Sequence, residues 1–271
     1  MLNFTDINKE AIGQLAPFFA GQCTHLSDYS LGYQFMWYKY LAPAFAVAED
    51  CLIIREHYAG RDWFRYPLSR TGDMEAERRA VALIERCCRD HEVRLRFSGV
   101  KADAVPWLTL RYSDVSVTNT RRWRDYLYEA ESFRTFAGGK YAGQRNHVNK
   151  FKKMYPDWSF EGYMPAREAE LVAFLKEYEA AQRAKADELA DEEMNEVYGL
   201  VPMIVPFGLR CGLLRAGGKI VACAVGERCG DMLVVHVEKA LRGYEGVYPM
   251  VAQQFALAFA GDVTYLNRMD D

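Results

Sequence analysis

Residues 208–240 read GLRCGLLRAGGKIVACAVGERCGDMLVVHVEKA, and this stretch predicts three consecutive strands of one sheet. Alternating apolar runs, 208–214 and 219–227, flank the pair Gly217-Gly218, and a Gly-Gly pair in that position is a strong hairpin signal. A third strand, Met232–Glu238, follows the turn 228–231. The stretch therefore predicts an antiparallel sheet at the centre of the second half of the chain.

Helical and strand patterns alternate on both sides of this stretch. The apolar-striped helix Gly246–Phe259 and the strand Val263–Asn267 follow it, and two acidic helices, 166–184 and 187–198, precede it. The first half contains strand-like runs and a helical stripe within Asp73–Asp90. We therefore expect a mixed α+β or α/β chain in two domains, 1–123 and 124–271. Each would have a mixed, mostly antiparallel sheet flanked by helices.

Composition excludes several classes of protein. The 271 residues carry a net charge of −3 and are 50% apolar, which excludes a disordered chain and argues against a polybasic nucleic-acid-binding protein. The amino-terminal residues lack the pattern of a signal peptide, and no apolar run reaches the roughly 18 residues of a membrane span. The seven cysteines have no zinc-ligand spacing. We expect a cytoplasmic protein with reduced thiols, no metal and no membrane insertion.

A basic segment without acidic residues lies between Glu131 and Asp157. On a helix, Arg145, Asn149 and Lys152 share one face, beside an apolar face that can pack. The turn Gly138-Gly139-Lys140 at the start of this helix offers backbone N–H groups to an anion, although it is not a P-loop. The alternative is a solvated basic face that balances the charge of the acidic helices.

A run of aromatic residues in the first half has two interpretations. Tyr29, Tyr33, Phe35, Trp37, Tyr38 and Tyr40 are typical of core packing at a sheet edge. A surface that stacks nucleotide bases would need interleaved cations, and Lys39 is the only one in the run. We therefore expect these rings to belong to the core.

The end of the third strand carries candidate catalytic groups. Alternation predicts that His236 and Glu238 point to one face of the sheet. Glu238 is suited to act as a general base beside the start of a helix. The alternatives are an ion pair of Glu238 with Lys239 or a nearby Arg, and a buried structural role for His236. The turn 242–246 is a degenerate match to the pyrophosphate-binding turn of GNAT acetyltransferases.

Several motifs together resemble a bacterial family similar to the C-terminal domain of phosphatidylglycerol lysyltransferase. They are Asp125-Tyr126-Leu127-Tyr128, Gly139-Lys140, the string Arg145–Phe151, His236–Ala240, Gly246-x-Tyr248 and Tyr265-Leu266-Asn267-Arg268-x-x-Asp271. Members of that family, like the Fem-type peptidoglycan aminoacyltransferases, have two tandem GNAT-like acyltransferase folds. The resemblance also implies a further strand-forming segment after position 271, so we expect the second sheet to lack its last strands.

The resemblance implies transfer of an acyl or aminoacyl group from acyl-CoA or aminoacyl-tRNA to an amine or hydroxyl acceptor. It implies Glu238 as the base, with His236 orienting it or relaying a proton. Lys140, Arg145, Asn149, Lys152 and Gly246 would hold the donor and its phosphates, and Asn267, Tyr248 and Asp271 would position the reactants. Gln144, Ala252 and Met269 depart from the family pattern.

Two other functions stay open at this point. One is a non-catalytic module that binds a nucleotide, an RNA or an anionic metabolite. The other is a structural or regulatory subunit, with a homodimer formed through an exposed sheet edge. The acceptor of a transferase would be a small molecule or a peptide amine, and no tightly bound cofactor is expected.

Overall fold

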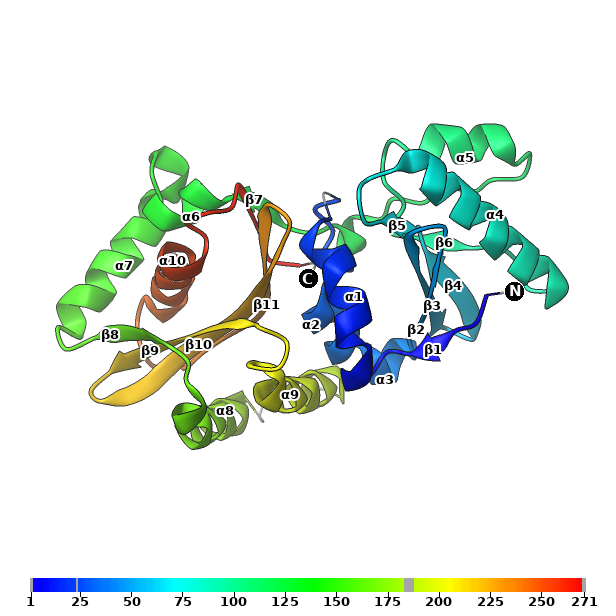
Figure 1. The fold of residues 1–271 in the computed structure, drawn as a ribbon. Helices are drawn as coiled ribbons and strands as arrows, with labels where there is room; N and C mark the ends of the chain where they lie inside the picture. The colour runs from blue at the N-terminus through cyan, green and yellow to red at the C-terminus, as the bar shows by residue number, and fades with distance from the viewer. Residues whose placement is uncertain (1, 23, 183–187, 270–271) are drawn as a thin grey trace. The chain divides into compact units, whose positions relative to one another are not determined.

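The computed structural model describes residues 2–22, 24–182 and 188–269, and the chain divides into two compact units (Figure 1). The first unit extends to Asp125, and the second comprises Tyr126–Met269. Each unit is built on its own sheet, with helices on both faces. The expected mixed α+β class is confirmed.

The sheet of the first unit has the order β1-β2-β3-β4-β6, and β5 pairs with β3. All pairs are antiparallel except β4–β6, which is parallel. The strands are β1 (Thr5–Asp6), β2 (Ala44–Ala48), β3 (Cys51–Tyr58), β4 (Arg61–Arg65), β5 (Leu68–Ser69) and β6 (Phe97–Ser98).

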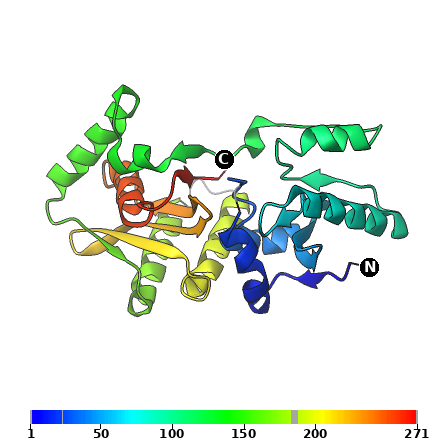
Figure 2. The ribbon, with the colours of Figure 1, turned by 45° about the horizontal axis from the view of Figure 1, so that its top comes forward.

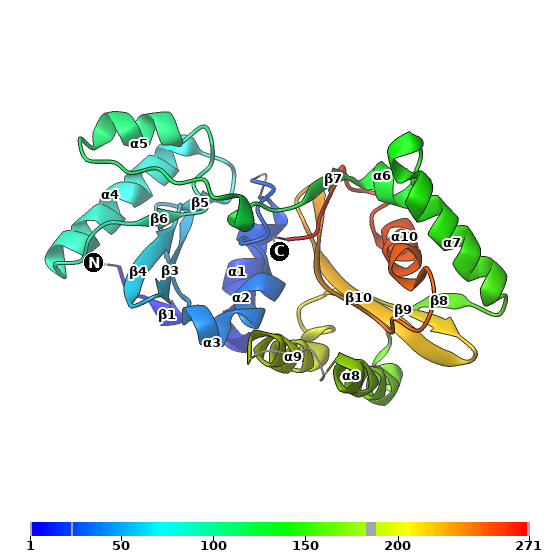
Figure 3. The ribbon, with the colours of Figure 1, turned by 180° about the vertical axis from the view of Figure 1, so that it is seen from behind.

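The helix α4 (Met74–Asp90) covers one face of this sheet (Figure 3). It begins at Asp73, whose carboxylate accepts hydrogen bonds from the N–H groups of Glu75 and Ala76. Its apolar stripe packs on Ile53 and Phe64. The other helices of the unit are α1 (Ile12–Ala20), α2 (Leu31–Met36), α3 (Tyr38–Leu41), α5 (Val105–Arg111) and the short 3-10 turns η1 (Lys9–Ala11) and η2 (Arg121–Trp123).

The aromatic run of the first unit lies on the helices α2 and α3 rather than at a sheet edge. Tyr29 is buried, as expected for core packing, but Tyr38 and Tyr40 are exposed. The expectation that the whole run belongs to the core is therefore wrong for its last residues.

The sheet of the second unit has the order β7-β12-β11-β10-β9-β8. It is antiparallel except for the parallel pair β11–β12. Gly217 and Gly218 form the predicted hairpin turn with φ of 60° and 76°, a region that glycine adopts without strain. The strands are β7 (Leu127–Glu129), β8 (Ser159–Gly162), β9 (Arg210–Ala216), β10 (Lys219–Cys229), β11 (Met232–Ala240) and β12 (Tyr265–Asn267).

Helices cover both faces of this second sheet (Figure 1). One face carries α6 (Ala130–Thr135), α7 (Ala142–Met154) and α10 (Val247–Phe259), and α7 runs alongside α10 (Figure 2). The other face carries α8 (Glu168–Gln182) and α9 (Glu188–Leu200). The 3-10 turns are η3 (Gly139–Tyr141), η4 (Pro165–Arg167) and η5 (Val201–Met203).

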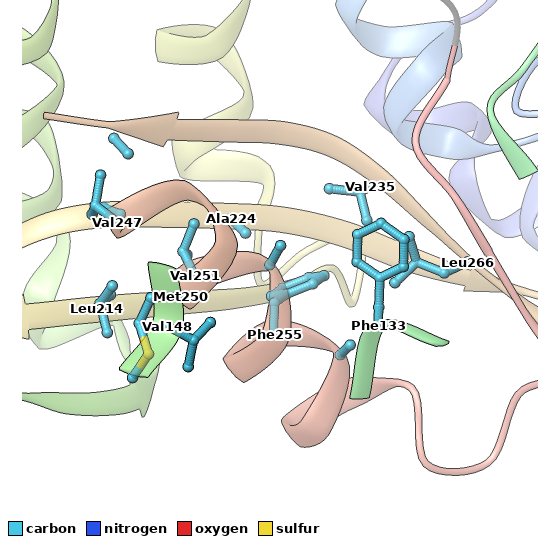
Figure 4. Close-up of a cluster of buried hydrophobic side chains, with 14 of the residues drawn as sticks. Phe133, Val148, Leu214, Ala224, Val235, Val247, Met250, Val251, Phe255 and Leu266 are labelled. Atoms are coloured by element: carbon cyan, nitrogen blue, oxygen red, sulfur yellow. The ribbon is translucent and has the colours of Figure 1, made fainter. Parts of the chain in front are cut away.

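The larger core of the second unit lies between the sheet and α10 (Figure 4). Met250, Val251 and Phe255 of α10 point toward Leu214, Ala224 and Val235 of the strands. Phe133 and Val148 add the inner surfaces of α6 and α7. This core fixes the position of the end of β11, which carries the candidate catalytic residues, and of the loop that leads from it to α10. Within the described ranges, every helix is too short or too polar to cross a membrane.

Candidate functional site

The pairing of β10 with β11 contains a β-bulge next to the candidate catalytic residues. Val225 lies opposite Val237 and Gly226 opposite Val235, so β11 carries one extra residue, His236, at this point. Gly226 permits the close approach of the two strands, because a Cβ atom there would lie 2.2 Å from the carbonyl oxygen of Val234. A bulge reverses the alternation of side chains along the strand that carries it.

The bulge separates the two residues that were expected to share a face. Glu238 lies opposite Ala224, which belongs to the core under α10. Val237 lies opposite Val225, and both line a small cavity on the α8 and α9 face. His236 contacts Glu227, which is on that same second face because it alternates with Val225 along β10. The expectation that His236 orients Glu238 is therefore wrong.

His236 is part of a buried pair. Its side chain is fully buried, and Nε2 lies 2.9 Å from Oε1 of Glu227. Among the described residues, Nδ1 has no hydrogen-bond partner. Sequence reasoning missed Glu227, and only the bulge, which the sequence signals weakly through Gly226, brings it to the imidazole.

Glu238 is mostly buried and has a cationic partner. The Arg268 guanidinium donates to Oε1 of Glu238 at 2.9 Å and lies over the ring of Phe133, 5.6 Å from its centroid. Burial raises the pKa of the Glu238 carboxyl above its usual range, and the charge of Arg268 opposes that rise. Lys239, the other expected partner, instead pairs with Glu193 at 2.5 Å. Glu238 is thus a carboxylate whose proton affinity depends on one arginine.

Asn267 holds the segment that carries Arg268. Its side chain is completely buried, and Oδ1 accepts a hydrogen bond from the N–H of Met269 at 2.7 Å. Beyond β12, the N–H of Arg268 donates to the carbonyl oxygen of Tyr126 at 3.0 Å. These bonds fix the backbone on both sides of the guanidinium. Asp271, the other expected positioning residue at this end, lies outside the described residues.

A pocket of about 310 Å³ opens where β11 ends. Its walls are Ala240–Tyr244, which lead from β11 toward α10, and the last turns of α8, including Tyr178. Burial and the interaction of its hydroxyl with Tyr178 together raise the pKa of Tyr248 to about 12. Arg242 contributes an exposed cation to the wall. The pocket therefore combines aromatic surface, backbone groups, the exposed cation of Arg242 and the carboxylate of Glu177, which pairs with Lys219 at 2.8 Å.

The start of α10 offers few amide groups to an anion. Gly246 precedes the helix with φ of 78°, and a Cβ atom there would lie 2.2 Å from the carbonyl oxygen of His147 in α7. The glycine is therefore required for the packing of α10 on α7. In the first turn, the N–H of Val247 donates to the carbonyl oxygen of Tyr244, and Pro249 has no N–H. Phosphate binding by Gly246 stays a prediction.

The basic residues of α7 and η3 do not line this pocket. The Arg145 guanidinium donates to the carbonyl oxygens of Phe136 and Gly138, and thereby braces the turn before α7. Lys140 lies over the ring of Tyr141 and Lys152 over that of Trp158, at 4.8 and 5.4 Å from the centroids. Asn149 is exposed. Lys150 pairs with Glu245 at 2.5 Å and so ties α7 to the loop that forms the pocket.

No cluster of three or more His, Cys, Asp or Glu side chains within the described part of the chain has a geometry that could hold a metal ion. The residues that could hold an anionic group are the cations of α7, Arg242 and the amides of the loop 242–246. Sequence reasoning missed the pairing partners Arg268 and Glu193 and the pocket residue Tyr178. Of these three residues, only Arg268 could have been found from the sequence, because it follows Asn267 in the motif 265–271.

Comparisons with known proteins agree with this architecture. The family model for the C-terminal region of phosphatidylglycerol lysyltransferase matches residues 23–269. No curated protein sequence matches the chain. Among solved structures, a conserved protein of unknown function from Bacteroides thetaiotaomicron has a TM-score of 0.91 at 24% identity, with 100% of this chain and 91% of that chain covered.

Two further solved structures share the fold. L-PGS from Bacillus licheniformis has a TM-score of 0.66 at 12% identity, and 98% of this chain and 79% of that chain are covered. FemX has a TM-score of 0.61 at 7% identity, with 100% and 89% covered. The expectation of tandem GNAT-like folds of the Fem type is confirmed.

Proposed function

Because this chain belongs to the family of the phosphatidylglycerol lysyltransferase C-terminal region, a family of acyl and aminoacyl transferases, we propose that it transfers an aminoacyl group from aminoacyl-tRNA to an amine or hydroxyl acceptor. The observation that carries the proposal is the mostly buried carboxylate of Glu238, paired with Arg268 at the end of paired strands. Acyl-CoA is the alternative donor.

Glu238 is the proposed general base. The acceptor nitrogen or oxygen attacks the ester carbonyl of the donor and passes its proton to the Glu238 carboxylate. The tetrahedral intermediate then collapses, the bond to the ribose oxygen breaks, and the leaving oxygen takes up a proton. A carboxyl whose pKa is raised toward neutrality is a stronger base, which makes the buried environment of Glu238 suitable for this step.

Two features favour a tRNA donor over acyl-CoA. Pro249 and the bonded N–H of Val247 leave the start of α10 with few amides for a compact pyrophosphate. The exposed basic side chains around α7, among them Lys153, extend over a broader surface, as contacts to a polynucleotide backbone require. We propose that Lys140, Arg145, Asn149 and Lys152 help to bind donor phosphates, and that Asn267 and Tyr248 position the reacting groups.

The test is a transfer assay with radiolabelled aminoacyl-tRNAs and, in parallel, acetyl-CoA, each offered to panels of amine and hydroxyl acceptors. Glu238→Gln should lower kcat by about 10²- to 10⁴-fold, the usual contribution of a general base, and should leave donor binding unchanged. Glu131→Gln, which alters an exposed carboxylate of α6 paired with Arg134, is the matched control and should keep full activity.

Three outcomes distinguish the alternatives. Transfer from acetyl-CoA alone would show that the donor is acyl-CoA and not aminoacyl-tRNA. Full activity of the Glu238→Gln variant would show that Glu238 is not the general base. Donor binding without transfer by the wild-type protein would reject the enzyme and support a non-catalytic binding module.

A further inference from the structure

Four aromatic side chains of the first unit, each half-buried or exposed, contact one another in a row. Trp37, Tyr40, Tyr58 and Trp123 contact one another in sequence, with centroid separations of 6.2, 5.6 and 6.4 Å. We refer to these four residues as the aromatic ladder. They come from the end of α2, from α3, from β3 and from η2, so only the tertiary structure brings them together.

The outer part of the ladder is open to solvent. The exposed fraction is 51% for Tyr40 and 58% for Trp123. Large aromatic surfaces exposed side by side mark interaction sites more often than isolated exposed apolar residues do. The rings meet edge-on or tilted.

Positive charges surround the ladder. Arg61 lies directly opposite Tyr58 in the β3–β4 pair and therefore projects from the same sheet face. Lys39 precedes Tyr40, Arg121 begins the η2 turn that carries Trp123, and Arg124 follows that turn. These four cations are exposed. Of these four cations, only Lys39 lies within the run 29–40. The other three lie elsewhere in the sequence, and the fold brings them to the ladder.

Three acidic residues close to the ladder in sequence or strand register have partners within the described part of the chain. Glu56, on the same face as Tyr58, is buried and pairs with Arg65 at 2.8 Å. Asp62 lies opposite His57 on the other face and pairs with it. Asp125 accepts hydrogen bonds from the N–H and hydroxyl of Ser27. The surface around the rings is therefore cationic.

We propose that the aromatic ladder of the first unit binds single-stranded nucleic acid, with bases stacked on Tyr40 and Trp123 and phosphates contacted by Arg61, Arg121 and Arg124. Exposed rings with interleaved cations are the combination that binds unpaired nucleotides without sequence readout. Neutral glycans also stack on aromatic rings, but they carry no negative charge that the surrounding cations could bind. This surface is distinct from Glu238 and does not depend on the transfer reaction.

The first test measures binding of a fluorescently labelled ten-nucleotide single-stranded RNA to the full chain. Because stacking contributes about 1–3 kcal/mol per base, Trp123→Ala and Tyr40→Ala should each weaken binding by about five-fold or more. Trp123→Phe, which keeps a ring, should retain most of the affinity. Leu110→Ala alters a residue of α5 that is 88% exposed, and this control should bind like the wild type.

The second test measures the salt dependence of the same binding. Three phosphate contacts predict a slope of log affinity against log salt of about −2, and Arg61→Gln or Arg124→Gln should each reduce its magnitude by about 0.7. Arg79→Gln is the matched control, because Arg79 is exposed but pairs with Glu49 at 2.8 Å. Glu238→Gln should not change the affinity, so failure of the transferase proposal leaves this result intact.

Two results would overturn the proposal. One is RNA binding that neither aromatic variant weakens. The other is salt-independent binding that a neutral oligosaccharide displaces, which would assign the ladder to a glycan instead.

Discussion

Arg268 donates a hydrogen bond to the Glu238 carboxylate at 2.9 Å, although the two residues lie 30 positions apart in the sequence. Parallel pairing of β11 and β12, together with the bulge in β11, brings them together. The guanidinium lowers the pKa of a carboxyl that burial would otherwise raise further. The properties of Glu238 as a base are therefore set by a residue on another strand.

The first prediction concerns the pH dependence of transfer. If Glu238 is the base, the acidic limb of kcat against pH reports its ionisation. Arg268→Gln removes the charge that lowers the pKa of Glu238, so the limb should move to higher pH. Lys239→Gln is the matched control, because Lys239 pairs with Glu193 rather than with Glu238. An unmoved limb in Arg268→Gln would show that another group titrates.

The second prediction concerns stability. The pKa of Glu238 is raised in the folded state, so between the unfolded value of about 4.3 and the folded value the folded protein binds more protons than the unfolded chain. This contribution to stability is fully present below the unfolded pKa and is lost as pH rises through the folded pKa. Glu238→Gln should therefore gain stability relative to wild type as pH is raised from about 4 to 8.

Urea unfolding across that pH range measures the difference, with Glu245→Gln as the surface control. A constant difference between Glu238→Gln and wild type would contradict the raised pKa.

The third prediction concerns the contact between α10 and α7. In Gly246→Ala, the added methyl group meets the carbonyl oxygen of His147 and the residue keeps a φ of 78°. Strain and displacement together should destabilise the second unit by about 2 kcal/mol or more. Gly243→Ala, in the same loop, is the matched control, because its Cβ atom would meet nothing within 4 Å. Equal thermal midpoints for the two variants would refute the packing role of Gly246.

The fourth prediction concerns a buried charge cluster in the first unit. Arg65 forms ion pairs with Asp28 and Glu56. Its guanidinium also donates a hydrogen bond to the Tyr33 hydroxyl oxygen at 3.0 Å. Arg65→Met leaves two carboxylates without their cation, and such a loss costs about 3–5 kcal/mol of unfolding free energy. Arg79→Met, which removes an exposed ion pair, should cost about 1 kcal/mol or less. Similar urea midpoints for the two variants would contradict the burial of the cluster.

Much of the fold follows from local patterns. Residues 208–240 predict the strands β9, β10 and β11 because a Gly-Gly turn separates two alternating apolar runs, and a local turn brings neighbouring strands into register. The helix over 73–90 follows from its apolar stripe and the capping carboxylate of Asp73. These features depend on residues close together in the chain, so the sequence alone predicts them.

Local patterns and motifs were enough to predict the class of the fold, its main helices and strands, the family, and the candidate base Glu238. The tertiary structure decided that His236 and Glu238 point to opposite faces, because one extra residue at the bulge reverses the alternation. It also decided that Arg268 is the partner of Glu238, and that cations from β4 and η2 join the aromatic ladder. Each of these depends on contacts between distant segments, which local periodicity does not encode.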